Sequence, residues 1–405
     1  MDPIRNPYAP GAGQRPPELS GRDEQLEAFE VVLARVARAR PERSVVLTGL
    51  RGVGKTVLLN AMRSAAVRAG WGTGKFEARP DLSIRRPLAS AVHQAVRELG
   101  PTCGASEHAL GVIRSFAQKD SGGTGTPRGR TAPNQLRDRW NLGITVPAVL
   151  GRADSGDIEI DLVELLTDLG GTAADTGRGV AIFIDEMQDL GPDDVSALCA
   201  AAHEISQTGQ PLIVVGAGLP HLPAVLSASK SYSERLFRYT RIDRLDRAAA
   251  DAALVRPAWE EDAAWDPEAL DAMYATTGGY PYFIQAYGKA VWDLAPGTPI
   301  TPADVAVAAP EAESELAVGF FGSRFERATP GEREYLRAMA ELAADAGEGA
   351  EAVWTSDVAT YLGRKPQSLS PARDALLKKG LIYSGERGQI SFTVPHFGRY
   401  LRDHP

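Results

Sequence analysis

Short apolar runs alternate with longer amphipathic segments over the first 245 residues of the chain. Uninterrupted apolar runs are typical of strands buried on both faces of a parallel sheet, and they occur at residues 44–48 (SVVLT), 180–184 (VAIFI) and 211–216 (PLIVVG). Apolar residues three or four positions apart predict helices, at residues 23–40, 57–69, 88–99, 107–118, 161–174 and 193–207. This alternation predicts an α/β fold whose parallel sheet is covered by helices on both faces.

The remainder of the chain has a different pattern. Residues 246–309 have no buried-strand run and predict several short helices interrupted by prolines. A connecting helix at about 311–327 leads to a final segment with helices at 332–342, 355–362 and 365–379 and short β-runs at 381–383 and 389–394. Three helices followed by a β-hairpin are the layout of a winged helix, so we predict that fold for the C-terminal segment.

The composition narrows the class of protein. The chain has 405 residues, of which 43% are hydrophobic and 24% charged, as in a globular protein of two or three domains. It has no apolar stretch of membrane-spanning length and no secretory signal. Two cysteines without a CxxC pair and six histidines without an HExxH pattern give no reason to expect disulfides or zinc. We therefore expect a cytoplasmic protein, whose net charge of −8 leaves only local surfaces for nucleic acid.

Residues 49–56 (GLRGVGKT) match the phosphate-loop pattern GxxxxGK[ST] between a predicted strand and a predicted helix. In such a loop, main-chain N–H groups and the helix N-terminus bind phosphate oxygens. Lys55 would reach the β- and γ-phosphates, and the Thr56 hydroxyl would bind Mg²⁺. The alternative is a glycine-rich turn with an accidental lysine. The candidate nucleotide-binding residues of this segment are Gly49, Gly52, Val53, Gly54, Lys55, Thr56 and Val57.

Two carboxylates, Asp185 and Glu186, directly follow the predicted strand at 180–184. Asp185 can hold Mg²⁺, through water or through the site of Thr56, and Glu186 can orient and polarise the water that attacks the γ-phosphate. Taken alone, the pair could equally be an exposed acidic turn. With the phosphate loop upstream, we interpret Asp185 as a metal-site residue and Glu186 as a catalytic residue.

The two motifs together resemble those of the AAA+ ATPases and the related STAND ATPases, above all the archaeal-type and origin-recognition-like members that end in a winged helix. Residues 21–26 (GRDEQL) resemble the short box that lies beside the adenine pocket in that family, which makes Arg22 a candidate nucleotide contact. The resemblance implies ATP and Mg²⁺ as cofactors, because no guanine-recognition motif of the NKxD kind follows.

The predicted domain organisation follows from these patterns. The leader at 1–20 is expected to be flexible because it contains five prolines. A P-loop ATPase domain spans 21–245, with an insertion at about 73–156 that contains a low-complexity loop at 121–129. A helical lid at 246–310 and a connecting helix with the winged helix at 311–405 complete the chain.

Two positions match the family pattern and one departs from it. Arg235 matches the arginine that reaches a neighbouring subunit's ATP; the alternative is a surface arginine paired with carboxylates, and Arg238 and Arg241 compete for the role. Residues 279–281 (GYP) resemble the GxP signature of STAND lids, so that Tyr280 and Pro281 would contact the base or ribose, although a plain turn between lid helices has the same residues. The strand at 211–216 ends in glycine and alanine where many relatives have a polar sensor, which predicts slow hydrolysis.

The helix at 365–379 is the predicted recognition helix of the winged module. Residues 330–405 contain 10 basic and 10 acidic residues, but 364–380 contain five basic residues and a single aspartate, Asp374. One face of the helix is expected to be buried, through Leu369, Ala372, Leu376 and Leu377. The candidate DNA contacts are Lys365, Gln367, Ser368, Lys378 and Arg387. We expect weak, salt-sensitive DNA binding, or else a purely structural or protein-binding module.

The favoured interpretation is an ATP-binding and hydrolysing switch that acts on DNA or a DNA-bound complex and can form homo-oligomers on binding ATP. One alternative is a STAND-type signalling or defence regulator whose winged helix makes protein contacts. Another is a nucleotide-binding scaffold with negligible turnover. DNA-stimulated ATP hydrolysis, ATP-dependent oligomerisation without DNA affinity, and tight ATP binding without phosphate release would distinguish the three.

Overall fold

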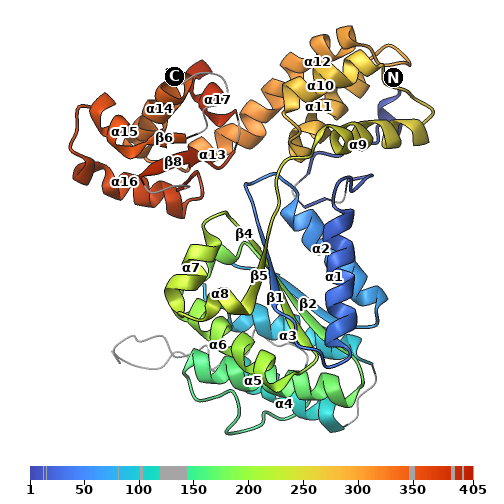
Figure 1. Cartoon of the computed structure of the whole chain (residues 1–405), viewed down its shortest axis with the longest axis vertical. Coiled ribbons are helices and arrows are strands. Elements are labelled where there is room, and N and C mark those ends of the chain that lie inside the picture. The colour runs from blue at the N-terminus through green and yellow to red at the C-terminus, as the bar shows by residue number, and fades with distance from the viewer. Residues whose placement is uncertain are drawn as a thin grey trace, which may run out of the picture.

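A computed structural model describes residues 1–11, 13–14, 16–80, 82–100, 104–118, 144–345, 352–384, 388–394 and 396–404. The predicted loop at 121–129, Cys103 and the candidate DNA contact Arg387 lie outside these residues. An α/β domain carries two smaller helical regions side by side on one end (Figure 1). None of the helices in the described part of the chain is long and apolar enough to cross a membrane.

Five parallel strands form the sheet of the α/β domain. They are β1 (Ser44–Thr48), β2 (Gly72–Glu77), β3 (Val180–Asp185), β4 (Leu212–Gly218) and β5 (Phe237–Arg241), in the order β2-β3-β4-β1-β5. Side chains alternate between the two faces along each strand. Val45 and Leu47 of β1 therefore pack into one hydrophobic cluster and Val46 packs into the other, which confirms that the sheet is buried on both sides.

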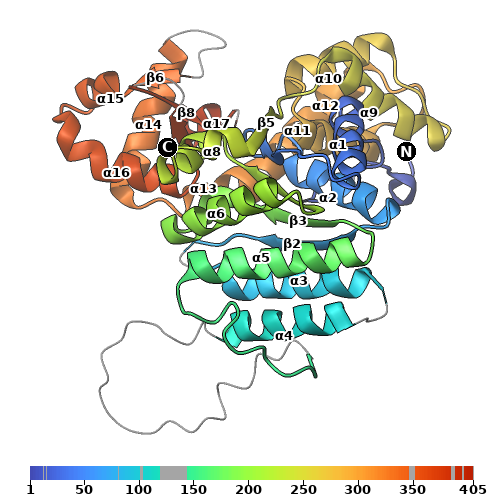
Figure 2. The same ribbon diagram turned by 60° about the horizontal axis from the view of Figure 1, so that its bottom comes forward.

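Helices cover both faces of this sheet. One face packs against α1 (Asp23–Val36) and α2 (Lys55–Arg68), and the other against α3 (Arg85–Glu98), α5 (Ile158–Asp175) and α6 (Pro192–Thr208). Figure 2 shows α3 and α5 beneath the sheet, with α4 (Gly104–Gln118) farther out. The short helices α7 (Leu222–Ser229) and α8 (Ser233–Leu236) connect β4 to β5.

Strands β2 and β5 are absent from the strands that the sequence predicts. Because β2 pairs with β3 along its whole length and α3 packs on β2, the predicted insertion at about 73–156 is wrong in its first part: residues 72–98 belong to the core of the domain. Helix α9 (Arg247–Glu260) follows β5, and the lid boundary near residue 245 stays a prediction.

The lid consists of α9, α10 (Pro267–Thr277), α11 (Pro281–Leu294) and α12 (Pro302–Glu315). The N-terminal segment packs on it, unlike the flexible leader that the prolines predict. Tyr8 is buried between Trp265 and Trp292, donates a hydrogen bond to Leu254 O at 2.6 Å and accepts one from Trp265 Nε1 at 2.9 Å. The packing of the Tyr8 ring and the two hydrogen bonds of its buried hydroxyl hold the segment in place.

Helix α12 continues through a π-helical segment, η5 (Leu316–Gly322), and α13 (Ser323–Phe325) into the C-terminal domain. This domain contains α14 (Pro330–Asp345), β6 (Ala352–Trp354), α15 (Thr355–Tyr361), α16 (Pro366–Lys378), β7 (Ile382–Ser384), β8 (Gln389–Phe392) and α17 (Phe397–Asp403). The strands form an antiparallel sheet in the order β6-β8-β7. The element order is compatible with the predicted winged helix, with one further strand and one further helix.

Candidate functional site

The phosphate loop lies where the pattern predicts, between β1 and α2. Gly52 and Gly54 have φ angles of 84° and 91°, a region that residues with a Cβ rarely adopt, so both glycines are needed for the shape of the loop. Gly54 is the N-cap of α2, and Lys55 is its first residue. The N-terminus of α2 therefore opens into the loop, as a phosphate site requires.

Lys55 is only 7% exposed, and its ammonium group is directed back at the loop. The Nζ atom donates to the carbonyls of Gly49 at 2.9 Å and Leu50 at 2.7 Å. Burial lowers the pKa of Lys55 to about 8; the charge of Glu186 opposes this shift and the charge of Arg51 adds to it. A buried ammonium with only main-chain oxygens as hydrogen-bond partners is poised for an anionic ligand.

Residues from two distant segments support the loop. Arg22, predicted to lie beside the nucleotide, is 7% exposed and donates from Nη2 to Val53 O at 3.2 Å and to Asp243 O at 2.5 Å. Tyr280 of the lid is 1% exposed and donates from its hydroxyl to Arg51 O at 2.6 Å. Both side chains thus hold the loop through its carbonyls, a role that the sequence pattern does not distinguish from ligand contact.

The carboxylates Asp185 and Glu186 end β3 at the same edge of the sheet as the loop. Asp185 is 5% exposed, and its Oδ2 lies 3.5 Å from Lys75 Nζ. Glu186 has a φ of 51°, which turns the chain sharply after the strand. Oxygen ligands such as the Asp185 carboxylate and the Thr56 hydroxyl suit Mg²⁺. Asp185 ends β3 at this edge, and Thr56 lies in the first turn of α2, which begins there.

Glu186 is held by two residues that sequence reasoning missed. Gln188 donates from Nε2 to Glu186 Oε2 at 2.5 Å and accepts from the N–H of Leu219, just after β4, at 3.0 Å. Arg51 Nη1 lies 3.8 Å from Glu186 Oε1. Gln188 thus links the carboxylate to the end of β4, where the sequence lacks a polar sensor residue.

A third missed residue is Arg324, in α13. Its guanidinium lies 3.8 Å from the ring centroid of Phe320, which in turn stacks on Tyr282 of the lid. The N–H of Tyr282 donates to Gly52 O in the loop at 3.3 Å. Burial, together with the charge of Arg51, lowers the pKa of Arg324 to about 10. No sequence signal near 324 indicates that this arginine approaches the phosphate loop.

The remaining predicted residues are placed as follows. Pro281 is the first residue of α11, and the partly buried Thr56 and Val57 lie in the first turn of α2. The N-terminal segment lies close to this first turn of α2. A methyl group built on Gly13 would be 3.0 Å from Thr56 Cγ2. Arg235 is exposed on α8. Its contact with the ATP of a neighbouring subunit stays a prediction.

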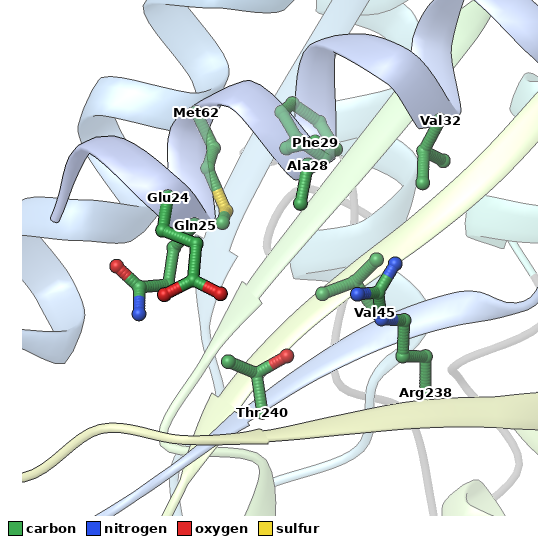
Figure 3. Close-up of a pocket in the computed structure, with 9 residues that line it drawn as sticks. All are labelled: Glu24, Gln25, Ala28, Phe29, Val32, Val45, Met62, Arg238 and Thr240. Carbon is green, nitrogen blue, oxygen red and sulfur yellow. The ribbon is translucent and has the colours of Figure 1, made fainter.

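A separate cavity of about 80 Å³ lies between α1 and β5 (Figure 3). Glu24 and Gln25 of α1 line it opposite Arg238 and Thr240 of β5. No residue of the phosphate loop lines it, and a nucleotide-sized ligand needs a pocket of roughly 300 Å³ or more. This cavity is therefore too small and too far from the loop to be the ATP site.

Four of the five candidate DNA contacts lie on α16 or at its N-cap, and the fifth, Arg387, is outside the described residues. Lys365, the N-cap of this helix, and Gln367, Ser368 and Lys378 are exposed, whereas Leu369 and Leu376 are buried as predicted. Ser368 donates from Oγ to Lys365 O at 2.7 Å. The side chains are thus available at the surface.

Comparisons with known proteins agree with this geometry. Residues 18–215 match the model of the AAA ATPase domain. This part of the chain is an AAA ATPase domain. The match includes the phosphate loop, Asp185 and Glu186, and it supports the ATP hydrolysis that the two motifs predict. Residues 318–401 match a domain of unknown function (DUF8462), and no curated protein matches the sequence.

Solved structures resemble the whole chain, the AAA ATPase domain included. The Walker-type ATPase of Pyrococcus abyssi is 16% identical, with a TM-score of 0.58 over 96% of this chain and 97% of that chain; this likeness concerns the fold. The Aeropyrum pernix ORC1 protein in complex with DNA is 15% identical, with a TM-score of 0.45 over 96% and 94% of the two chains. The Thermotoga maritima RuvB Holliday junction branch migration motor is 17% identical, with a TM-score of 0.45 over 96% and 99%.

Proposed function

We propose that the protein is an ATP-controlled switch that hydrolyses ATP slowly and acts on DNA or a DNA-bound complex through its C-terminal domain. The observation that carries the ATP part is the convergence of Lys55, Asp185 and Glu186 at one edge of the sheet, with the ammonium of Lys55 buried and directed at loop carbonyls. In the nucleotide complex, Lys55 would leave these carbonyls for the β- and γ-phosphates.

Each residue of the site would then have one task. The main-chain N–H groups of the phosphate loop and the N-terminus of α2 bind the phosphates. Thr56 and Asp185 would hold Mg²⁺, which neutralises charge on the phosphates. Glu186 would orient the attacking water and accept its proton, after moving away from Gln188 and Arg51, which contact its carboxylate in the structure. The need for this movement supports slow turnover.

The DNA part of the proposal depends on the exposed face of α16. Its first turn is open, with Lys365 at the N-cap and Gln367 and Ser368 beside it, and such a turn meets base edges when a winged helix enters the major groove. Its flanking basic residues would contact phosphates.

A second candidate function is a STAND-type regulator whose C-terminal domain acts through protein contacts. It is favoured by the ion pairs that already engage basic residues of this domain: Arg364 with Glu334 at 3.0 Å and Lys379 with Glu332 at 2.5 Å. Basic residues paired in this way are less available to DNA phosphates.

One experiment separates the two. Phosphate release is measured with and without duplex DNA at low salt, and the molecular mass is measured with and without ATP. Stimulation by DNA supports the DNA switch. ATP-dependent oligomers without any DNA affinity support the regulator instead, and tight ATP binding without phosphate release would contradict hydrolysis altogether.

A further inference from the structure

The C-terminal domain contacts the ATP site through Gly380, which follows α16. Gly380 is buried and has a φ of 63°. A methyl group built on it would lie 2.8 Å from Nη2 and 3.2 Å from Nε of Arg51, and 3.3 Å from Cδ1 of Leu219. The missing side chain of Gly380 therefore makes the room that the Arg51 side chain occupies.

Both residues that touch Gly380 lead directly to Glu186. Arg51 Nη1 lies 3.8 Å from one carboxylate oxygen, Oε1. The N–H of Leu219 holds Gln188, whose side chain donates to the other carboxylate oxygen, Oε2, at 2.5 Å. Each oxygen of the proposed general base is thus held by a chain of contacts that starts at the same glycine of the C-terminal domain.

The position of Arg51 depends on this packing. Arg51 belongs to the phosphate loop, but its Nε is buried and has no hydrogen-bond partner among the described residues. The Arg51 guanidinium is therefore kept beside Glu186 by the shape of its surroundings, Gly380 included, more than by its own hydrogen bonds. A carboxylate that is engaged at both oxygens is less free to turn toward a water molecule and accept its proton.

We propose that Arg51 is a positioning residue through which the docked C-terminal domain restrains ATP hydrolysis. While Gly380 packs on Arg51 and Leu219, Glu186 stays engaged by Arg51 and Gln188. When the domain moves away, Arg51 gains room to leave Glu186, and the carboxylate can reach water. This inference rests on the proposed role of Glu186 in hydrolysis, and it holds whether the C-terminal domain binds DNA or protein.

Two glycines of the C-terminal domain provide a matched test. Gly363 and Gly380 each follow a helix, with φ angles of 62° and 63°. A methyl group on Gly363 meets no atom of the described residues within 4 Å, whereas one on Gly380 meets Arg51. Gly363→Ala and Gly380→Ala therefore introduce the same backbone strain, but only Gly380→Ala displaces Arg51.

Steady-state ATP hydrolysis of the full-length variants measures the restraint. Gly380→Ala and Arg51→Ala should each raise kcat by roughly 2- to 10-fold, which is the change expected when one polar interaction of Glu186 is lost. Gly380→Ala should leave the KM unchanged, Gly363→Ala should keep the wild-type rate, and Arg51→Lys should stay closer to the wild-type kcat than Arg51→Ala. In the Arg51→Ala background, Gly380→Ala should add little, because its methyl group approaches Arg51 to 2.8 Å but Leu219 only to 3.3 Å.

Several outcomes would overturn the inference. They are equal rates for the two glycine variants, an effect of Gly380→Ala that persists without Arg51, and a lower kcat in Arg51→Ala. If Gly380→Ala does not fold, as its melting temperature beside that of Gly363→Ala would reveal, the Arg51 variants still decide. Absence of any phosphate release that depends on Lys55 would instead contradict the proposed ATPase site, so the two failures are distinguishable.

Discussion

The ATP site and the exposed face of α16 both carry basic residues, but these residues differ in their burial and in their hydrogen-bond partners. Lys55 is 7% exposed and donates only to main-chain carbonyls, whereas Lys365 and Lys378 are in contact with solvent. The neighbours of Lys365 and Lys378 on the same domain, Arg364 and Lys379, are paired with glutamates. Burying a charge costs free energy, part of which an oppositely charged ligand can restore. An exposed charge costs very little free energy and does not by itself indicate a binding site.

This difference explains why one site is better defined than the other. The phosphate loop gathers the N-terminus of α2, two glycines with positive φ and a desolvated lysine, and each of these features suits an anion. The α16 face offers only solvated charge on a neutral domain. Variants that remove charge should therefore have large effects at the loop and small effects on α16.

The largest effect is expected from Lys55→Ala. The substitution removes the counter-charge of the β- and γ-phosphates inside the loop, and ATP affinity should fall by at least roughly 100-fold, because charge-assisted hydrogen bonds to phosphate are the strongest contacts of such a site. Isothermal titration calorimetry with a slowly hydrolysed ATP analogue checks this. Lys289→Ala, which removes a partly exposed lysine of the lid, is the control and should bind normally. Unchanged affinity in Lys55→Ala would contradict the phosphate-loop assignment.

The next effect is expected from Glu186→Gln, which keeps the size of the side chain but cannot accept a proton. ATP binding should persist while the turnover number falls by roughly 10²- to 10⁴-fold. Rapid-quench measurement of phosphate release tests the loss of turnover, and the bound-nucleotide content tests whether ATP binding persists. Glu260→Gln, at an exposed position of α9, should have no effect. Turnover within about twofold of wild type would remove Glu186 from the role of general base.

A smaller effect is expected from pH. Because burial lowers the pKa of Lys55 to about 8, the free protein loses this proton as the pH rises above 8, and it must regain the proton when the phosphates arrive. ATP affinity should therefore be constant below about pH 7 and fall toward tenfold per pH unit above 8. Calorimetry in two buffers of different ionisation enthalpy should detect proton uptake. In Lys55→Arg, whose side chain does not deprotonate, any remaining binding should lose this pH dependence; a flat profile in the wild type would contradict the shift.

The contrast between the two regions also shows what the sequence can predict. Strand β1 and the first five residues of β3 are short apolar runs, and the phosphate loop has a signature of its own. Strand β2 (GTGKFE) has no such run, because Gly72 and Gly74 let the backbone of α3 pack directly on it: a methyl group on either would lie 2.4 Å from Ala95 O or 2.1 Å from Ala91 O. Strand β2 is buried because its two glycines have no side chains, and a search for apolar residues does not find such a strand.

The contacts around Glu186 could not be predicted for a different reason. Arg51, Gln188 and Gly380 belong to three segments that are far apart in the sequence, and none of them lies in a regular pattern of spacing. Arg51 and Gln188 meet at Glu186 within the AAA ATPase domain, and the packing of the C-terminal domain against it adds Gly380. The same holds for Arg324, which reaches the loop through Phe320 and Tyr282. Tertiary contacts of this kind leave no local trace in the chain.

The smallest effect is expected on the α16 face, from the combined substitution of Lys365, Lys378 and Arg387 by alanine. If these residues meet DNA phosphates, the loss of three contacts should weaken binding modestly and flatten the slope of log K against log salt by up to about three units. Fluorescence anisotropy with a labelled duplex over a salt series measures both quantities. The matched control removes three exposed arginines before β1, Arg38, Arg40 and Arg43. An equal loss in the control would show that binding depends on overall charge, and no DNA affinity at low salt, with or without ATP, would favour the regulator whose C-terminal domain binds protein.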